Sequence, residues 1–600
     1  KATYGRKGDK IVQMNYDAID AGAKQVVEIA VPESWKDAAD EGLTTPHVGE
    51  GGRADVVDFV KNIQAKVNAQ EGNTLPVSAF NEYVDGSTPS GSSAYEKRGI
   101  AVDIPIWQPD NCIQCNRCAY VCPHAVIRPI ALTEEEAANA PEGMDMIDMI
   151  GMPNMKFSIA VSAYDCTGCG SCANVCPGKK GEKALVMGNM EANAGRQTFF
   201  DYGTELPIKP EVVAKFKETT VKGSQFKQPL LEFSGACAGC GETPYAKLIT
   251  QLFGDRMYIA NATGCSSIWG NSSPSTPYTV NPQGRGPAWS NSLFEDNAEF
   301  GYGMLLAQNT IRERLKASVE KLVENGANDD VKAAAQEYLD TFSVGATNGT
   351  ATDKLVKALE DCDCGCAERA ELLKNKDFLA KKSQWIFGGD GWAYDIGFGG
   401  VDHVLASGQD INIMVFDTEV YSNTGGQSSK ATKTGATAQF AAGGKETKKK
   451  DLAGIAMSYG YVYVAQIAMG ADFNQTVKAI AEAEAYPGPS LIIAYAPCIN
   501  HGIKKGMSKA QTEEQLAVEC GYWNNFRFNP EAEKKFTLDS KEPKGDYQEF
   551  LNGEVRYNAL MRANPEKAQR LFAQNEAEAM ERYEYLKGLV NLYDGTAKED

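Results

Sequence analysis

The chain contains 600 residues, more than a single hydrophobic core usually organises, so we expect several domains. Its 60 basic and 79 acidic side chains give a formal net charge of −19, which argues against nucleic acid as a partner because phosphate binding requires clustered Lys and Arg. No apolar run is long enough to cross a membrane, and the 16 cysteines fall mostly in Cys-x-x-Cys clusters without a secretory signal. A reducing, cytoplasmic location is therefore expected.

Residues 1–50 carry an apolar pattern that stops at Pro32, and the first residue is Lys1 rather than Met. This pattern predicts the end of a domain that begins upstream, so residue 1 is expected to be an internal position of a longer chain. Residues 51–98 are rich in turn-forming residues, particularly at 86–91, and are predicted to be a linker.

The block from 99 to 205 contains one cysteine motif twice. In each copy three cysteines lie three positions apart and a fourth follows directly before Pro; the copies are Cys112, Cys115, Cys118, Cys122 and Cys166, Cys169, Cys172, Cys176. Three thiolates from one tight loop bind one cubane, and the fourth cysteine reaches the other cluster. The motif therefore predicts two [4Fe–4S] clusters, whose ligands are Cys112, Cys115, Cys118 and Cys176 in one and Cys166, Cys169, Cys172 and Cys122 in the other.

This block resembles the bacterial two-cluster ferredoxins, which implies an α+β fold and clusters close enough to relay single electrons. A zinc ribbon is the alternative, but zinc ribbons use two Cys pairs and lack a duplicated four-cysteine run followed by Pro. Iron–sulfur clusters are thus the favoured interpretation of residues 99–205.

Beyond residue 205, short apolar runs alternate with helical segments; the runs are 257–260, 385–387, 411–416, 461–467 and 491–496. This alternation predicts a parallel sheet with helices on its faces, an α/β domain over 206–545. Residues 305–380 interrupt it with charged, alanine-rich helical sequence, and 546–600 are predicted to be a helical extension. The interruption contains Cys362, Cys364 and Cys366, which are either free thiols or a metal site.

A predicted strand runs into Gly389-Asp390-Gly391, and the next strand runs into Thr418. Because parallel strands end at the same edge of a sheet, Asp390 and Thr418 are expected to lie together there. A carboxylate, a hydroxyl and a carbonyl are suitable Mg²⁺ ligands, and glycines let backbone amides approach a diphosphate. The pattern resembles the Gly-Asp-Gly…Asn motif of thiamine diphosphate enzymes, although Thr418 stands where Asn is commonest.

Four further cysteines, Cys237, Cys240, Cys265 and Cys498, are expected near this edge, since Cys265 and Cys498 also follow predicted strands. Their spacing leaves two possibilities open, a third cubane or structural thiols. The wider pattern then adds a resemblance. Cys237-Ala-Gly-Cys240-Gly-Glu242, residues 262–267, residues 389–392 and residues 418–423, together with the duplicated cysteine motif, resemble the C-terminal half of the pyruvate:ferredoxin oxidoreductase family, pyruvate synthase, over essentially the whole chain.

The resemblance implies a cluster proximal to thiamine on Cys237, Cys240, Cys265 and Cys498, and Mg²⁺ held by Asp390, Thr418 and the Val420 carbonyl. It implies that Asn423 faces the reacting centre as a catalytic residue. The residues that it implies line thiamine diphosphate are Glu242, Cys265, Gly389, Asp390, Gly391, Trp392, Thr418, Glu419, Val420, Tyr421, Ser422 and Asn423.

It further implies reversible oxidative decarboxylation of pyruvate with coenzyme A to acetyl-CoA and CO₂, with electrons leaving singly through three [4Fe–4S] clusters to ferredoxin or flavodoxin. A homodimer and an N-terminal, pyrimidine-binding half of the same enzyme are expected partners. Two alternatives remain: a sister 2-oxoacid:ferredoxin oxidoreductase, and a non-catalytic iron–sulfur electron-transfer module.

Overall fold

The computed structural model describes residues 4–5, 8–37, 52–272, 275–324 and 328–593. Contacts divide the chain into two compact units, residues 1–46 and 47–600. The first unit contains helix α1 (Asp9–Lys24) and a 3₁₀ turn (Glu33–Asp37), and Val12 is its only buried residue among those described. Apolar side chains that suggested the end of an upstream domain, such as Ile19 and Val26, are exposed. Residues 38–51, at the predicted boundary, lie outside the described residues.

The second unit begins with short helices in the predicted linker. Helices α2 (Ala54–Phe59) and α3 (Ala65–Asn68) flank a π-helical turn (Val60–Gln64), and 3₁₀ turns follow. The last of these turns is fixed to a distant loop, because Thr276 N donates to Ser92 Oγ at 2.9 Å and Ser93 N donates to Thr276 O at 3.2 Å. The predicted linker is thus held by contacts with the loop around Thr276, which lies in the α/β domain.

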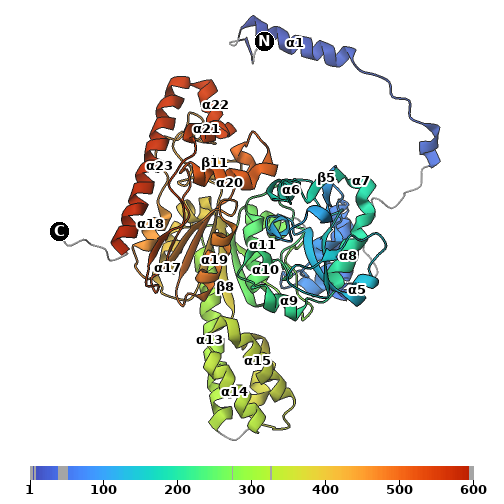
Figure 1. Ribbon diagram of the computed structural model, residues 1–600, viewed down its shortest axis with the longest axis vertical. Helices are drawn as coiled ribbons and strands as arrows, with labels where there is room; N and C mark the ends of the chain where they lie inside the picture. The colour runs from blue at the N-terminus through green and yellow to red at the C-terminus, as the bar shows by residue number, and fades with distance from the viewer. Residues whose placement is uncertain (1–3, 6–7, 38–51, 273–274, 325–327, 594–600) are drawn as a thin grey trace, which may run out of the picture. The chain divides into compact units, whose positions relative to one another are not determined.

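The cysteine-rich block is an α+β unit (Figure 1). Strands β1 (Asp103–Trp107) and β5 (Leu185–Asn189) form one antiparallel pair, and β2 (Ile127–Thr133), β4 (Met155–Val161) and β3 (Ile147–Asp148) form a three-stranded sheet in the order β2-β4-β3. Short helices carry the ends of both cysteine motifs, α4 (Arg117–Tyr120) and α6 (Ser171–Val175). Helices α5 (Glu134–Ala138), α7 (Met190–Asn193), α8 (Gln197–Glu205), α9 (Pro210–Lys215) and α10 (Val221–Ser224) complete this part.

An eight-stranded sheet forms the centre of the larger domain, in the order β15-β14-β12-β13-β9-β8-β6-β7. The six strands from β12 to β7 are parallel, which confirms the predicted α/β class, while two antiparallel edge strands were not predicted. The strands are β6 (Met257–Ala262), β7 (Ala288–Ser292), β8 (Ser383–Gly389), β9 (Asn412–Asp417), β12 (Tyr463–Ile467), β13 (Ser490–Tyr495), β14 (Phe526–Phe528) and β15 (Phe536–Leu538).

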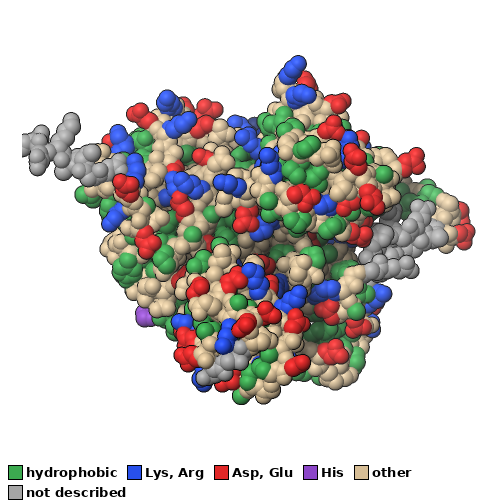
Figure 2. Space-filling model, turned by 60° about the horizontal axis from the view of Figure 1, so that its bottom comes forward, with side chains coloured by type: hydrophobic (Ala, Val, Ile, Leu, Met, Phe, Trp, Pro, Cys, Tyr) green, Lys and Arg blue, Asp and Glu red, His purple; other side chains and the backbone are tan. Residues whose placement is uncertain are grey.

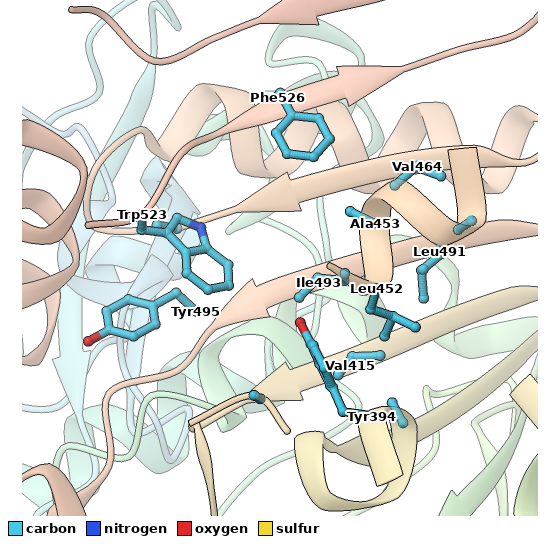
Figure 3. Close-up of a cluster of buried hydrophobic side chains, with 14 of the residues drawn as sticks. Tyr394, Val415, Leu452, Ala453, Val464, Leu491, Ile493, Tyr495, Trp523 and Phe526 are labelled. Atoms are coloured by element: carbon cyan, nitrogen blue, oxygen red, sulfur yellow. The ribbon is translucent and has the colours of Figure 1, made fainter. Parts of the chain in front are cut away.

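Alternation along the central strands divides the interior into two cores. Ile413 and Val415 of β9 face one core, whereas Met414 and Phe416 face the other. Helices α11 (Thr243–Phe253) and α19 (Phe473–Ala485) cover the second core. The first core is covered by the start of α13 (Asn297–Glu324), α17 (Phe398–Ala406), α18 (Leu452–Met457) and α23 (Pro565–Tyr593). Figure 3 shows part of the first core, in which Val415, Val464, Leu491 and Ile493 of the sheet lie around Leu452 and Ala453 of α18. Continuous apolar strands are typical of a sheet covered on both faces.

Two helical additions extend this domain (Figure 1). Helices α13 (Asn297–Glu324), α14 (Asp329–Thr341), α15 (Gly345–Glu360) and α16 (Ala367–Lys374) form an insertion with a core of its own. The chain then ends its described part in α20 (Ala510–Glu519), α21 (Tyr547–Asn552), α22 (Val555–Ala563) and α23 (Pro565–Tyr593). Among the described residues, none of the helices combines the length and apolar character that a membrane span requires.

The cysteine-rich block and the sheet domain are joined by buried contacts within residues 47–600. Tyr120 and Val121, at the end of α4, belong to the core covered by α11 and α19. Lys247 of α11 is buried, and its Nζ donates to the carbonyls of Ala119 and Tyr120. On the solvent-exposed side, the face in Figure 2 has basic and acidic side chains interspersed rather than segregated.

Candidate cofactor and cluster sites

The structure groups the eight ferredoxin-type cysteines as the motif predicts. Cys112, Cys115, Cys118 and Cys176 line one small cavity, and Cys122, Cys166, Cys169 and Cys172 line a second. Each cavity thus receives three cysteines from one loop and one cysteine from the other loop. The exchange follows from the short helices α4 and α6, which carry the fourth cysteine of each motif away from its own loop.

The loops turn backbone amides toward the sulfur atoms. Gln114 N donates to Cys112 Sγ and Gly168 N donates to Cys166 Sγ, both at 3.4 Å. Gln114 and Gly168 have φ values of 55° and 67°, the left-handed conformation that folds each loop back on its first cysteine. Hydrogen bonds to cluster sulfurs are one of the protein's means of tuning a cluster's potential.

Burial disfavours ionisation of these thiols. It raises the pKa of Cys166 to about 12 and raises those of Cys118 and Cys172 well above the usual range. Buried thiolates here therefore need a compensating positive charge, which the iron of a bound cluster would supply. Across the residues that the structure describes, no three His, Cys, Asp or Glu side chains are arranged as ligands of a single ion. A cubane has a different requirement, because its four ligands bind four separate iron atoms.

The second group of predicted residues lies at the carboxyl edge of the central strands. Asp390 directly follows β8, Thr418 directly follows β9, Cys265 follows β6 and Cys498 follows β13. These four strands are consecutive neighbours in the sheet, in the order β13-β9-β8-β6, and all are parallel. Residues that are distant in sequence therefore meet at one edge.

Three oxygen atoms that could ligate a metal ion converge at this edge. Thr418 Oγ1 lies 3.0 Å from Asp390 Oδ1 and 3.0 Å from Val420 O, and all three residues are buried. Ser429 Oγ donates to the other carboxylate oxygen of Asp390 at 2.5 Å, a contact that the sequence did not indicate. Burial and the neighbouring Asp417 raise the pKa of Asp390 well above its usual range. A cation between the three oxygens would favour the ionised carboxylate, so this donor set fits Mg²⁺.

A buried charge network supports the loop that carries these donors. Lys449 Nζ lies 2.6 Å from Asp417 Oδ2 and 3.2 Å from Glu419 Oε1, and Arg556 also pairs with Glu419. Although burial alone would raise it, the pKa of Glu419 is held below its usual range by Lys449 and Arg556. Burial lowers the pKa of His501 to about 3, so its ring is neutral and carries one N–H. Because a carbonyl oxygen only accepts, that N–H is on Nε2, which donates to Thr418 O at 2.7 Å. The carboxylate of Glu419 is thus already paired with Lys449 and Arg556, which leaves its backbone rather than its side chain for contact with a cofactor.

The predicted thiamine-lining residues differ in their exposure. Gly391 and Trp392 are buried, Gly389, Tyr421 and Ser422 are partly exposed, and Asn423 is exposed. Gly391 must lack a side chain, because an added Cβ would lie 2.4 Å from the Tyr421 ring. Trp392 Nε1 is buried with no hydrogen-bond partner among the described residues. A cofactor could therefore reach the partly exposed Gly389, Tyr421 and Ser422 and the exposed Asn423.

Cys240, Cys265 and Cys498 lie near Glu242 at the same edge, and Cys237 lies near Cys498. Burial is the main cause that raises the pKa values of Cys240 and Cys265, and the negative charge of Glu242 is the second. A smaller contribution to both comes from Cys498. Cys265 Sγ lies 3.1 Å from Ser422 Oγ, which connects this group to the loop that carries Thr418 and Val420. Burial raises the pKa of Glu242 to about 7, while Trp269 Nε1 donates to its Oε2 at 2.8 Å. Trp269 is a second neighbour that the sequence did not indicate.

The loop with Cys237 and Cys240 is held close to the loop after β13. Gly241 N donates to Pro497 O at 3.2 Å, one residue before Cys498. An added Cβ on Gly241 would lie 2.6 Å from Pro497 N, so only glycine permits this approach. The cysteine positions thus depend on a tight contact between two distant segments.

Comparisons with known families match three parts of the chain. Residues 111–181 match the family described as 4Fe-4S dicluster domain, and residues 370–494 match the thiamine pyrophosphate enzyme, C-terminal TPP binding domain. Residues 51–101 match a domain of unknown function called EKR. The chain therefore contains a 4Fe–4S domain followed by a thiamine diphosphate-binding domain.

Curated relatives match the chain almost from end to end. A pyruvate-flavodoxin oxidoreductase of Enterobacter agglomerans is 54% identical over 98% of this chain and 50% of the relative, and a pyruvate:ferredoxin oxidoreductase of Moorella thermoacetica is 54% identical with the same coverage. A pyruvate dehydrogenase [NADP(+)] of Cryptosporidium parvum is 44% identical over 100% of this chain and 34% of its own length. The chain spans about half the length of the first two relatives. Over nearly its whole length, the chain is thus similar to about half of the pyruvate:ferredoxin and pyruvate-flavodoxin oxidoreductases.

Proposed function

We propose that this chain is the C-terminal half of an enzyme that converts pyruvate and coenzyme A to acetyl-CoA and CO₂ and passes two electrons, one at a time, to ferredoxin or flavodoxin. The observation that carries the proposal is the single sheet edge shared by two groups: the oxygen donors Asp390, Thr418 and Val420, and the cysteines around Glu242. An electron source and an electron acceptor would be neighbours there.

The chain's own residues would hold Mg²⁺ and the diphosphate. Asp390, Thr418 and the Val420 carbonyl supply the metal ligands, and Ser429 orients the Asp390 carboxylate through its 2.5 Å hydrogen bond. When bound, thiamine diphosphate supplies the electron sink for decarboxylation. Asn423, exposed on the same loop, would contact the substrate, and Ser422 would lie between that region and Cys265.

Three [4Fe–4S] clusters would form the electron path. Cys237, Cys240, Cys265 and Cys498 would bind the proximal cluster, and the cavity with Cys122 would hold the next one. His124 Nε2 lies 2.9 Å from Ala236 O, so the residue beside Cys237 touches the lining of that cavity. An added Cβ on Gly239 would lie 2.6 Å from Met507 O, and one on Gly170 would lie 3.6 Å from Ser508 Cβ. The short turn at Met507–Lys509 therefore contacts both the loop with Cys237 and Cys240 and the loop of the second cysteine motif, which supports this order of the first two clusters.

The cavity lined by Cys112, Cys115, Cys118 and Cys176 would hold the terminal cluster. Its lining shares no residue with the cavity that contains His124. We infer that ferredoxin or flavodoxin docks near this loop, and that the reaction can run in reverse. An N-terminal half carrying the pyrimidine-binding site, and a homodimer, complete the proposed enzyme.

Iron and thiamine analysis of the complete enzyme, purified without oxygen, tests the proposal. We expect about twelve irons per chain together with thiamine diphosphate and Mg²⁺, because each cubane has four irons. About eight irons without thiamine would instead identify a non-catalytic electron-transfer module, the reading that the duplicated motif alone would support.

Substrate choice is tested separately by reduction of ferredoxin with a panel of 2-oxoacids. We expect pyruvate to give the highest kcat/KM. An equal or higher value for 2-oxoglutarate or a branched 2-oxoacid would favour a sister enzyme of the same chemistry and would contradict the proposed substrate.

A further inference from the structure

The helical insertion contains three cysteines that have no part in the proposed function. Cys362, Cys364 and Cys366 lie in the loop between α15 and α16. Cys362 is 4% exposed and belongs to the core of the insertion, whereas Cys364 and Cys366 are partly exposed and pack against that core. One sulfur is therefore buried in the insertion's interior, and two are accessible at its surface.

The two accessible sulfurs are in contact. Cys364 Sγ lies 2.8 Å from Cys366 Sγ, whereas Cys362 Sγ accepts a hydrogen bond from Cys364 N at 3.3 Å. Gly365 separates the pair, and an added Cβ there would meet no atom within 4 Å. Since glycine tolerates unusual backbone angles and nothing crowds it, this loop can adopt the geometry of a bridge between Cys364 and Cys366.

We propose that Cys364 and Cys366 form a dithiol that a hydroperoxide oxidises to an intramolecular disulfide. One sulfur attacks the O–O bond and becomes a sulfenic acid, and the peroxide leaves as an alcohol, or as water if it is hydrogen peroxide. The second thiol then attacks the sulfenic sulfur, the S–S bond forms, and water leaves. Overall the two thiols lose two hydrogen atoms, and the peroxide gains two electrons and two protons.

The surroundings of the pair indicate which sulfur reacts and with what. Cys366 occupies the N-cap position of α16, where the partial positive charge of a helix N-terminus favours a negative sulfur. Asp361 and Asp363 are exposed in the same loop, so an uncharged peroxide approaches more easily than an anionic oxidant. Cys366 is therefore assigned as the attacking sulfur and Cys364 as the resolving one.

A soft-metal site fits the loop less well. Among the residues that the structure describes, no three Cys, His, Asp or Glu side chains are arranged to hold one ion, and these three cysteines are included in that statement. The insertion's core also contains none of the twelve cysteines assigned to clusters. Oxidation of this loop would therefore be a chemical event separate from electron transfer.

The test follows one proteolytic fragment of the complete enzyme. Trypsin cleaves after Lys357 and Arg369, so the fragment 358–369 contains Cys362, Cys364 and Cys366 and no other cysteine. Under anaerobic conditions the enzyme is treated with a stoichiometric amount of tert-butyl hydroperoxide, alkylated with iodoacetamide and digested. The mass of the fragment is then measured by mass spectrometry. We expect one alkyl group, on Cys362, and a mass lower by two hydrogens, with three alkyl groups recovered if reductant precedes alkylation.

Variants assign the chemistry to individual sulfurs. Cys364→Ser and Cys366→Ser should each lower the disulfide-bridged fraction more than about tenfold, whereas Cys362→Ser should leave it unchanged. In Cys364→Ser, dimedone should trap a sulfenic acid on Cys366. Three alkyl groups at a peroxide dose that oxidises a free Cys-Gly-Cys peptide in the same tube would overturn the proposal. A disulfide that includes Cys362 would also overturn it. So would a zinc ion that the unsubstituted enzyme binds and that is lost when a cysteine of this loop is replaced.

Discussion

The two cysteine-rich regions of this molecule bring their sulfurs together in different ways. In the ferredoxin-like block, a loop of short spacing supplies three cysteines to each cavity, and the neighbouring loop supplies the fourth. At the sheet edge, Cys265 and Cys498 are positioned by the parallel register of β6, β8, β9 and β13. The first arrangement is encoded locally, whereas the second exists only when the whole sheet is formed. Variants at the two places should therefore fail differently.

The largest effect is expected from Asp390→Asn at the sheet edge. The substitution keeps the size of the side chain but removes the carboxylate that Thr418 and Ser429 contact. Pyruvate-dependent acceptor reduction should fall by at least about 100-fold, the upper range for groups that support a bound metal. Thiamine diphosphate retained after gel filtration should fall with it, while iron content should stay unchanged. Full activity with full thiamine content would refute the assigned role of Asp390.

Cys498→Ala should remove one cluster and leave two. Iron content should fall by about four atoms per chain, and pyruvate-dependent reduction of ferredoxin should be lost because the first step of the path is missing. Cys520→Ala is the matched control, since Cys520 is a buried cysteine in a hydrophobic core rather than at the edge. An unchanged iron content in Cys498→Ala would show that the sheet-edge cysteines are structural thiols.

Cys176→Ala tests the locally encoded arrangement. If the fourth ligands are exchanged between the motifs, this variant should lose the cluster of Cys112, Cys115 and Cys118, although Cys176 belongs to the other motif in sequence. Iron should again fall by about four atoms, but thiamine content and reduction of a small viologen should persist. Electron paramagnetic resonance of the reduced variant distinguishes the remaining clusters, and loss of the cluster bound by Cys166, Cys169 and Cys172 would contradict the exchange.

The smallest effect is expected at Glu514 of α20, which belongs to neither group of cysteines. Burial raises the pKa of this carboxyl from its ordinary value of 4.5 to about 8, while Gly470 N donates to it at 2.7 Å. Because the folded protein keeps the proton that the unfolded chain releases, the free energy of unfolding should fall as pH rises from about 5 to about 8.

Glu514→Gln removes this titration and keeps the shape of the side chain. Its melting temperature should exceed that of the unmodified protein at pH 8 by about 1–3 °C, and the difference should shrink toward pH 5. Glu519→Gln, an exposed position on the same helix, is the control and should change neither the value nor its pH dependence. Equal pH profiles for Glu514→Gln and the unmodified protein would contradict the raised pKa.

Sequence spacing was enough to predict the two cysteine cavities and the strands that end at Asp390 and Thr418. It could not predict Ser429, Trp269 or Lys449, because each reaches its partner across the tertiary structure rather than along one element. It also missed the antiparallel strands β14 and β15, which are only three residues long and carry no periodicity to detect. The predicted domain boundaries remain predictions.

The buried contact of Lys247 has a consequence for the timing of electron transfer. Its ammonium or amine group binds the last carbonyls of α4, and burial lowers the pKa of Lys247 to about 7. In the proposed enzyme, electrons would pass between a cluster at the sheet edge and one in the cysteine-rich block, and transfer slows steeply as the distance between redox centres grows. The buried hydrogen bonds of Lys247 join these two parts, so they would help to keep that distance constant.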